Sequence, residues 1–219
     1  GCPMADMITP DDVRAVRAQH PGIPIVTYVN STAAVKAEST VCCTSANSIH
    51  VVESFKEHDA VYMAPDQNLA KYTARHTRKK VYHWNGYCPI HHNLTVEAVQ
   101  EKKKEHPDAL FLAHPECPPE ILDLADMVQS TSGMLRFVAE SSHEAFIIGT
   151  EEGILHPMRK KNPEKRFYSV SGTMVCPDMK KTSLEDVLSA METLQPRVSV
   201  PEEIRIRALD AVEKMLNIG

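Results

Sequence analysis

Glycine and aromatic residues are scarce in this chain of 219 residues, which has eight glycines and 5% aromatic side chains. Neither the G-x-G-x-x-G pattern of dinucleotide-binding folds nor the G-x-x-x-x-G-K-[ST] phosphate-binding loop occurs, which argues against both kinds of nucleotide site. So few rings also argue against a surface that stacks nucleic-acid bases. The formal net charge of −5 disfavours nucleic acid or an anionic membrane as the main partner.

No apolar run approaches the roughly 18 residues that a membrane-spanning helix needs, and no signal-peptide pattern is present. Hydrophobic residues make up 42% of the chain and charged residues 24%, which is typical of a soluble protein with its own core. We therefore expect a cytoplasmic chain. Because residues 1–4 (GCPM) resemble neither an initiator methionine nor a leader, and a helix-start pattern follows at Thr9, we expect the chain to continue a longer protein.

The six cysteines include no C-x-x-C pair, which weakens zinc-ribbon and thioredoxin interpretations. An even number could form three disulfides, but a chain of this length without a leader is more typical of a reducing compartment. Cys42 and Cys43 lie in a short apolar run, and Cys117 directly follows the block His114-Pro115-Glu116. We interpret these three as buried structural thiols.

A shift of 86 residues (88 − 2) reveals an internal repeat, because it places Cys2-Pro3 on Cys88-Pro89. A further shift of 88 residues (176 − 88) leads to Cys176-Pro177. Other coincidences are polar and follow short apolar runs: Tyr28-Val29-Asn30 with His114-Pro115-Glu116, and Thr44-Ser45 with Ser130-Thr131. Ligands bind beyond the carboxyl ends of the strands in open α/β sheets, so the repeat predicts one site faced by equivalent loops.

Both copies of the repeat have the same predicted elements. We expect helices at 10–19, 33–38 and 47–58, then at 96–105, 119–125 and 132–140, with strands at 23–29, 41–43 and 60–64, then at 109–113, 127–129 and 145–148. This alternation predicts an α/β fold: a pseudo-symmetric repeat of three-layer α/β/α sandwich domains with short parallel sheets. The predicted domains are 1–86 and 87–172, followed by 173–219, a cysteine-bearing loop with amphipathic helices at 183–194 and 201–216.

Cys2, Cys88 and Cys176 differ from the other cysteines, because each precedes proline at the border of a repeat. Three thiolates on equivalent loops would converge on one point, and thiolate sets select iron–sulfur clusters, zinc or copper(I). Three cysteines would leave the fourth iron of a [4Fe–4S] cluster open to act as a Lewis acid. Two other interpretations stay open at this point: coincidence of spacing, and a zinc site completed by His91 or His114.

A series of motifs runs in order along most of the chain and resembles the quinolinate synthase family. The motifs lie at residues 1–8, 26–37, 43–47, 65–69, 84–88, 113–117 and 130–134. The Tyr-Val-Asn block at 28–30 and the His-Pro-Glu block at 114–116 are highly specific in this order.

This resemblance implies an enzyme of de novo NAD biosynthesis, a transferase that condenses iminoaspartate with dihydroxyacetone phosphate to give quinolinate with loss of phosphate and water. It implies three similar α/β/α domains around a pseudo-threefold axis, two of them within this chain. A [4Fe–4S] cluster bound by one cysteine per domain would be held by Cys2, Cys88 and Cys176. An L-aspartate oxidase or dehydrogenase that supplies iminoaspartate is the expected partner. The family's first domain, with a further histidine and serine, would precede Gly1.

The resemblance also implies the residues that contact substrate: Tyr28, Val29, Asn30, Ser45, His114, Pro115, Glu116 and Thr131. We expect Glu116 to move protons, Tyr28 to donate from its phenol, and His114 to orient a carboxylate or hold phosphate. Ser45 and Thr131 lie where helices are expected to begin, which for either alone favours simple N-capping. Their equivalence under the 86-residue shift favours a shared anion pocket instead. A folded but inactive fragment is the remaining alternative.

Overall fold

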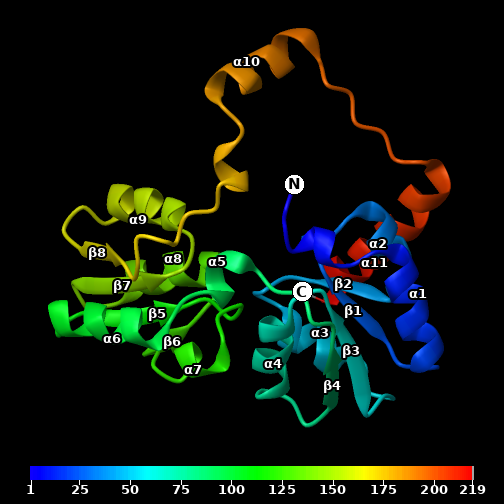
Figure 1. Ribbon diagram of the computed structural model, residues 1–219, viewed down its shortest axis with the longest axis horizontal. Coiled ribbons are helices and arrows are strands. Elements are labelled where there is room, and N and C mark those ends of the chain that lie inside the picture. The colour runs from blue at the N-terminus through cyan, green and yellow to red at the C-terminus, as the bar shows by residue number, and fades with distance from the viewer. Residues whose placement is uncertain (219) are drawn as a thin grey trace.

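The computed structural model describes residues 1–218, within which two sheets of four parallel strands are covered by helices (Figure 1). The first unit contains β1 (Ile25–Tyr28), β2 (Val41–Cys43), β3 (Ala60–Ala64) and β4 (Lys80–His83), in the order β2-β1-β3-β4. The second unit contains β5 (Leu110–Ala113), β6 (Met127–Val128), β7 (Ala145–Gly149) and β8 (Arg166–Ser169), in the order β6-β5-β7-β8. The predicted α/β class is confirmed.

Helices cover both faces of each sheet (Figure 1). In the first unit they are α1 (Pro10–Gln19), α2 (Ala33–Ala37), α3 (Ser48–Ser54) and α4 (Gln67–Ala74). In the second unit they are α6 (Val96–Glu105), α7 (Pro119–Leu122), α8 (Thr131–Glu140) and α9 (Leu155–Lys161), and the short α5 (Pro89–His92) joins the units.

The repeat seen in the sequence is also a structural repeat. A shift of 86 residues carries α1 onto α6 (10 to 96, 19 to 105) and β4 onto β8 (80 to 166, 83 to 169). The two long helices start in the same way, since the Thr9 hydroxyl accepts the N–H of Asp12 at 3.2 Å and the Thr95 hydroxyl accepts the N–H of Ala98 at 3.2 Å. Equivalent local chemistry therefore sets the register of both copies.

Most predicted elements are confirmed, with strands 41–43 and 60–64 and helices 10–19 and 96–105 correct at both ends. The helix predicted at 47–58 is too long, because it ends at Ser54. Beyond that point the Lys79 ammonium donates to the carbonyls of Phe55 and His58 at 3.0 and 2.8 Å. These carbonyls are satisfied by a lysine from the loop between α4 and β4 instead of by a further helical turn.

The helix predicted at 119–125 is also too long, since it ends at Leu122. The Leu124 carbonyl accepts from the Lys103 ammonium at 3.1 Å, and the Asp126 carboxylate accepts the N–H of Phe111 at 2.7 Å. These contacts turn the chain toward β6 before another helical turn can form.

Each sheet has a buried core on both of its faces, which makes three layers. Successive strand residues alternate between the faces: Ile25 of β1 packs with Val13 and Val16 of α1, whereas Val26 packs with Val51 on the other side. The second unit has the same arrangement, with separate apolar clusters around Phe111 and Phe146. Each unit therefore has its own core.

The C-terminal helix α11 (Glu202–Ile218) packs on the first unit, against α2 and β2. Ala211 and Met215 belong to the same buried cluster as Val26. The predicted domain ranges 1–86, 87–172 and 173–219 stay a prediction, but α11 returns from the third range to complete the core of the first.

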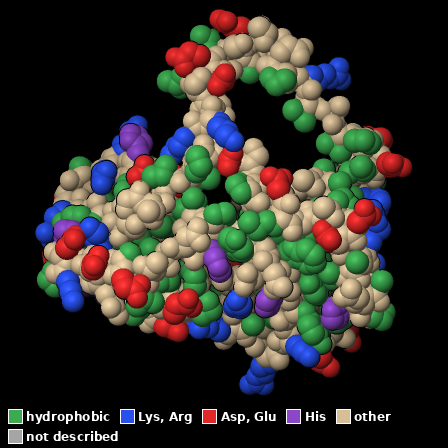
Figure 2. All heavy atoms as spheres, in the orientation of Figure 1, with side chains coloured by type: hydrophobic (Ala, Val, Ile, Leu, Met, Phe, Trp, Pro, Cys, Tyr) green, Lys and Arg blue, Asp and Glu red, His purple; other side chains and the backbone are tan. Residues whose placement is uncertain are grey.

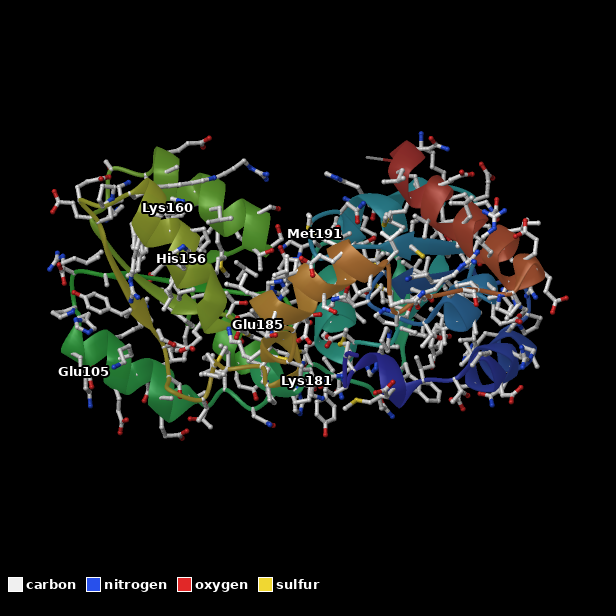
Figure 3. The ribbon with its side chains drawn as sticks, turned by 90° about the horizontal axis from the view of Figure 1, so that it is seen from above. Glu105, His156, Lys160, Lys181, Glu185 and Met191 are labelled. Atoms are coloured by element: carbon white, nitrogen blue, oxygen red, sulfur yellow. The ribbon has the colours of Figure 1, made fainter. Side chains whose placement is uncertain are left out.

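Residues between the second unit and α11 form an arch that carries α10 (Leu184–Thr193) away from both units (Figure 1). Ser183 and Asp186 form a capping box at its start. No residue of α10 is buried, and Leu184 and Met191 are 84% and 73% exposed. Seen from above, α10 lies over the junction of the units (Figure 3), and apolar side chains are visible along the arch (Figure 2).

Among residues 1–218, no helix combines the length and apolar character needed to cross a bilayer.

Candidate active site

A pocket of about 550 Å³ lies where the loops of the two units and the arch meet. It is lined by the three cysteines at the repeat borders, Cys2, Cys88 and Cys176, and by four of the predicted substrate residues, Tyr28, Asn30, Glu116 and Thr131. Residues that coincide in the two copies of the repeat therefore meet at one site, beyond the carboxyl ends of the strands.

The other predicted substrate residues lie beside or behind this pocket. His114 is buried and stacks on His91, with ring centroids 4.5 Å apart. Ser45 and Pro115 line a smaller hollow of about 110 Å³ between the units. Val29 packs against the core of the first unit, and its N–H donates to the carbonyl of Cys43 at 2.8 Å.

All six cysteines have free thiols, and those of Cys2, Cys88 and Cys176 are half-buried. Cys42, Cys43 and Cys117 are fully buried, as the sequence predicts. Burial raises the pKa of Cys42 to about 11 and raises the pKa values of Cys43 and Cys117 further. These three thiols therefore stay protonated and unreactive near neutral pH.

A carboxylate orients each of two pocket cysteines through its backbone. Asp66, the N-cap of α4, accepts the N–H of Cys88 at 2.9 Å and that of Leu69 at 2.7 Å. Glu151, the corresponding cap after β7, accepts the N–H of Cys176 at 3.2 Å and that of Gly153 at 2.8 Å. The pseudo-symmetry therefore extends to the groups that fix the cysteine loops.

Three half-buried thiols at one pocket are a soft donor set of the kind that binds iron–sulfur clusters, zinc or copper(I). A tetrahedral zinc with bonds of about 2.3 Å would hold its sulfurs about 3.8 Å apart. Within residues 1–218, the group whose possible ligand atoms all lie within 4.8 Å of one another is Cys88, His91 and Glu116. Among these described residues the three pocket cysteines do not form such a group, so at least one pair of their ligand atoms lies more than 4.8 Å apart in this structure.

Next to Cys88, two histidines surround the buried carboxylate of Glu116. Its Oε2 lies 3.2 Å from Nδ1 of His91 and 3.3 Å from Nδ1 of His114. His91 also contacts the sulfur of Cys88, at 3.2 Å from Nδ1, and the hydroxyl of Thr150, at 2.8 Å from Nε2. In the described residues 1–218, Oε1 of Glu116 has no hydrogen-bond partner although it is buried.

These contacts set the charges at the site. Burial alone would lower the pKa of His91, but hydrogen bonds to Cys88 and Glu116 outweigh it and raise that pKa to about 10. Burial alone would raise the pKa of Glu116, but hydrogen bonds with His114 and His91 hold it well below its usual range. Burial and the charge on His91 lower the pKa of His114. Glu116 is therefore ionised beside a protonated His91 and a neutral His114.

The phenol of Tyr28 stays protonated. Tyr28 ends β1 and is buried, and burial together with the charge of Glu116 raises its pKa well above the usual range. A neutral phenol can donate to a substrate oxygen. Thr131 is exposed at the first residue of α8, next to its N-cap Ser130, where free N–H groups favour an anion.

Sequence reasoning missed the roles of Asp66, Thr150 and Glu151, and it considered His91 only as a possible zinc ligand or a residue lining the site. Two signals could have revealed them. The 86-residue shift aligns 64–66 with 150–152 at the ends of β3 and β7, which marks an acidic loop in both units, although it pairs Asp66 with Glu152 and not with the N-cap Glu151. His91 follows Cys88, the N-cap of α5, by three residues, a spacing that brings two side chains to the same side of a helix.

Two α/β units that meet at a thiol-lined pocket define a repeat-built α/β protein with a ligand site at the carboxyl ends of its strands. The sequence model of the family described as "Quinolinate synthetase A protein" matches residues 1–217. The chain belongs to this family.

Curated relatives support the same assignment. The chain is 52% identical over 218 residues to a quinolinate synthase of Geotalea uraniireducens (strain Rf4), a match that covers 100% of this chain and 71% of the relative. It is 48% identical over 217 residues to quinolinate synthase 1 of Methanosarcina acetivorans, covering 99% and 71%. It is 52% identical over 215 residues to a quinolinate synthase of Methanoregula boonei, covering 98% and 71%. These relatives are named as enzymes.

Proposed function

We propose that this chain forms the active site of a quinolinate synthase, which condenses iminoaspartate with dihydroxyacetone phosphate to quinolinate with loss of phosphate and water. Family membership supports this reaction. The observation that carries the proposal is the meeting of Cys2, Cys88 and Cys176 at one pocket that also contains Tyr28 and Glu116.

Cys2, Cys88 and Cys176 would hold a [4Fe–4S] cluster. When bound, it supplies an iron without a protein ligand, which acts as a Lewis acid toward an oxygen or nitrogen of the substrate. The backbone contacts of Asp66 and Glu151 hold two of these cysteines in their loops. Such outer contacts orient the ligands of metal sites.

Glu116 is the group that we assign to proton transfer. Its Oε2 is held by histidine, and its Oε1 is without a partner in the described chain, beside the pocket. An ionised carboxylate with a free oxygen can remove a proton from a triose carbon and return it to a leaving hydroxyl. Burial keeps competing water away from this oxygen.

Tyr28 and Asn30 bind and orient the substrate in this proposal. The neutral phenol of Tyr28 donates a hydrogen bond, and the Asn30 amide offers both a donor and an acceptor to carboxylate groups. Thr131, at the start of α8, accommodates an anionic group. His114 packs behind Glu116 and limits the movement of its carboxylate.

The free thiols fit a reducing compartment, and we infer a cytoplasmic location. The substrate iminoaspartate requires an enzyme that oxidises aspartate, so an L-aspartate oxidase or dehydrogenase is the proposed supplier.

A zinc protein is the second candidate, and one observation favours it. Cys88, His91 and Glu116 bring a sulfur, a nitrogen and an oxygen within 4.8 Å of one another, which is a possible zinc donor set. In this alternative the remaining two cysteines would have no shared role at the pocket.

Anaerobic metal analysis with an activity assay tests the proposal. We expect about four iron and four sulfide per chain, the composition of a four-iron cluster. We also expect quinolinate to form from the two substrates. One zinc without sulfide would favour the second candidate. Because the match covers 71% of the relatives, the intact Geotalea enzyme is assayed in parallel. A cluster without turnover in this chain, with turnover in that enzyme, would mark the chain as inactive alone.

A further inference from the structure

We propose that His91, itself oriented by Thr150, is a positioning residue that fixes the Glu116 carboxylate and connects it to the Cys88 sulfur. The inference rests on the proposed function in one respect, the proton-transfer role of Glu116. Its structural part, the dependence of Glu116 on His91, is independent of that role.

Two histidine nitrogens reach the Glu116 carboxylate, and that of His91 is the nearer. A neutral imidazole has one N–H donor and one acceptor nitrogen. Nδ1 of His114 lies 3.3 Å from Oε2 and 3.4 Å from the backbone nitrogen of Glu116, so it is shared between these two groups. Nδ1 of His91 lies 3.2 Å from Oε2, and this contact helps to hold the carboxylate.

Thr150 determines which way the His91 ring faces. Its hydroxyl lies 2.8 Å from Nε2, and both residues are buried. Thr150 directly follows β7, so the orientation comes from the rigid end of a central strand in the second unit. His91 comes from α5, which has Cys88 as its N-cap and joins the two units. The contact thus fixes a connecting segment against the sheet.

The Nδ1 nitrogen of His91 contacts two groups, a cysteine sulfur and a carboxylate oxygen. Nδ1 is 3.2 Å from the Cys88 sulfur as well as from Glu116, which places one N–H between a cysteine ligand and a carboxylate. A displacement of the ring would therefore disturb both groups together. This double contact distinguishes His91 from an ordinary buried histidine.

A double-mutant cycle on chain without metal tests the structural part. His91→Leu leaves a buried carboxylate without its nearer histidine, whereas in the Glu116→Gln background it removes a contact to a neutral amide. We expect His91→Leu to raise the unfolding equilibrium constant at least tenfold more in the wild-type background than in the Glu116→Gln background. Equal effects in both backgrounds would overturn the proposal, whatever the reaction proves to be.

Kinetics and spectroscopy on the iron-loaded enzyme test the functional part. His91→Leu should lower kcat about 100-fold or more with KM changed less than threefold, and it should shift the reduction potential of the bound cluster. Thr150→Val should lower kcat about tenfold, and Thr150→Ser should restore it. His92→Gln is the matched control, because the neighbouring His92 contacts Asn68 and Tyr87 instead.

An unchanged kcat and potential in His91→Leu would contradict the link to catalysis and to Cys88. Loss of activity in Thr150→Ser equal to that in Thr150→Val would contradict the orienting role of the hydroxyl. If the wild-type chain binds no iron, the proposed function fails, and the double-mutant cycle still decides whether His91 positions Glu116.

Discussion

At the scale of single residues, the site depends on a few polar contacts in a buried setting. Glu116 is ionised because two histidines compensate for the cost of burying its charge. The three pocket cysteines are half-buried, and carboxylates hold the backbone N–H groups of Cys88 and Cys176, whereas the three other cysteines are packed in the cores. Cysteines of the same chain therefore differ in role, as possible metal ligands or as core residues, because their surroundings differ.

Glu116→Gln tests the proton-transfer role. Glutamine keeps the shape of the side chain but cannot accept a proton at neutral pH, so we expect kcat to fall about 100-fold or more. Absorbance of the bound cluster should be unchanged. Glu120→Gln, at an exposed acid four residues away, is the control and should retain full activity. Retained turnover in Glu116→Gln would remove this carboxylate from the mechanism.

Thiol reactivity tests the division of the cysteines into two sets. In native protein without metal, Cys2, Cys88 and Cys176 should react with iodoacetamide first, because their thiols reach the pocket. Cys42, Cys43 and Cys117 should react only after unfolding, because burial raises their pKa values and blocks access. Peptide mass spectrometry measures the order. Early labelling of Cys43 or Cys117 would contradict the described cores.

Removal of the carboxylates that hold the cysteine loops should weaken metal binding. Asp66→Ala and Glu151→Ala each leave a cysteine N–H without its acceptor, and outer contacts of this kind typically change metal affinity about tenfold or more. Iron release to a chelator, followed with time, is the measurement. Glu152→Ala, at the exposed neighbour of Glu151, should release iron at the wild-type rate. Equal rates in all variants would show that these carboxylates do not support the loops.

At the scale of elements, the two C-terminal helices differ although both are amphipathic in sequence. α11 buries Ala208, Ala211 and Met215, whereas α10 buries nothing. Amphipathic spacing predicts that a helix forms, but it does not identify the surface that covers its apolar side. The sequence alone therefore could not distinguish a core helix from the arch.

Stability measurements test this difference. Met215→Ala should lower the free energy of unfolding by about 2–4 kcal/mol, since it removes buried methylene groups from the first core. Leu188→Ala, at a side chain 56% exposed on α10, should change it by less than about 0.5 kcal/mol. Urea denaturation of both variants gives the comparison. A large loss from Leu188→Ala would mean that α10 is packed in solution.

Of the edge strands, β2 and β6 were predicted from the sequence, whereas β4 and β8 were not. Lys80 and Arg166 start β4 and β8 at exposed positions, and these strands have few buried residues. Edge strands often carry charge and lack the apolar run that marks a central strand. The central strands β3 and β7 have such runs, AVYMA and AFIIG, which is why the sequence located them well.

At the scale of the whole molecule, pseudo-symmetry explains what could be predicted about the site. Residues that repeat at 86 and 88 positions occupy equivalent loops, so their convergence followed from the sequence once parallel sheets were inferred. The contacts of His91 with Thr150 and Glu116 could not be predicted, because they join side chains 59 and 25 residues apart. Such long-range pairings depend on how the two units pack together.

The central claim is that three thiols from equivalent loops bind one cluster in the pocket between the units. A crystal structure of anaerobically loaded protein, with iron located by anomalous scattering, tests it most directly. The account predicts a single compact iron site bonded to the sulfurs of Cys2, Cys88 and Cys176. A single ion held by Cys88, His91 and Glu116, or disulfide bonds among the three cysteines, would contradict it.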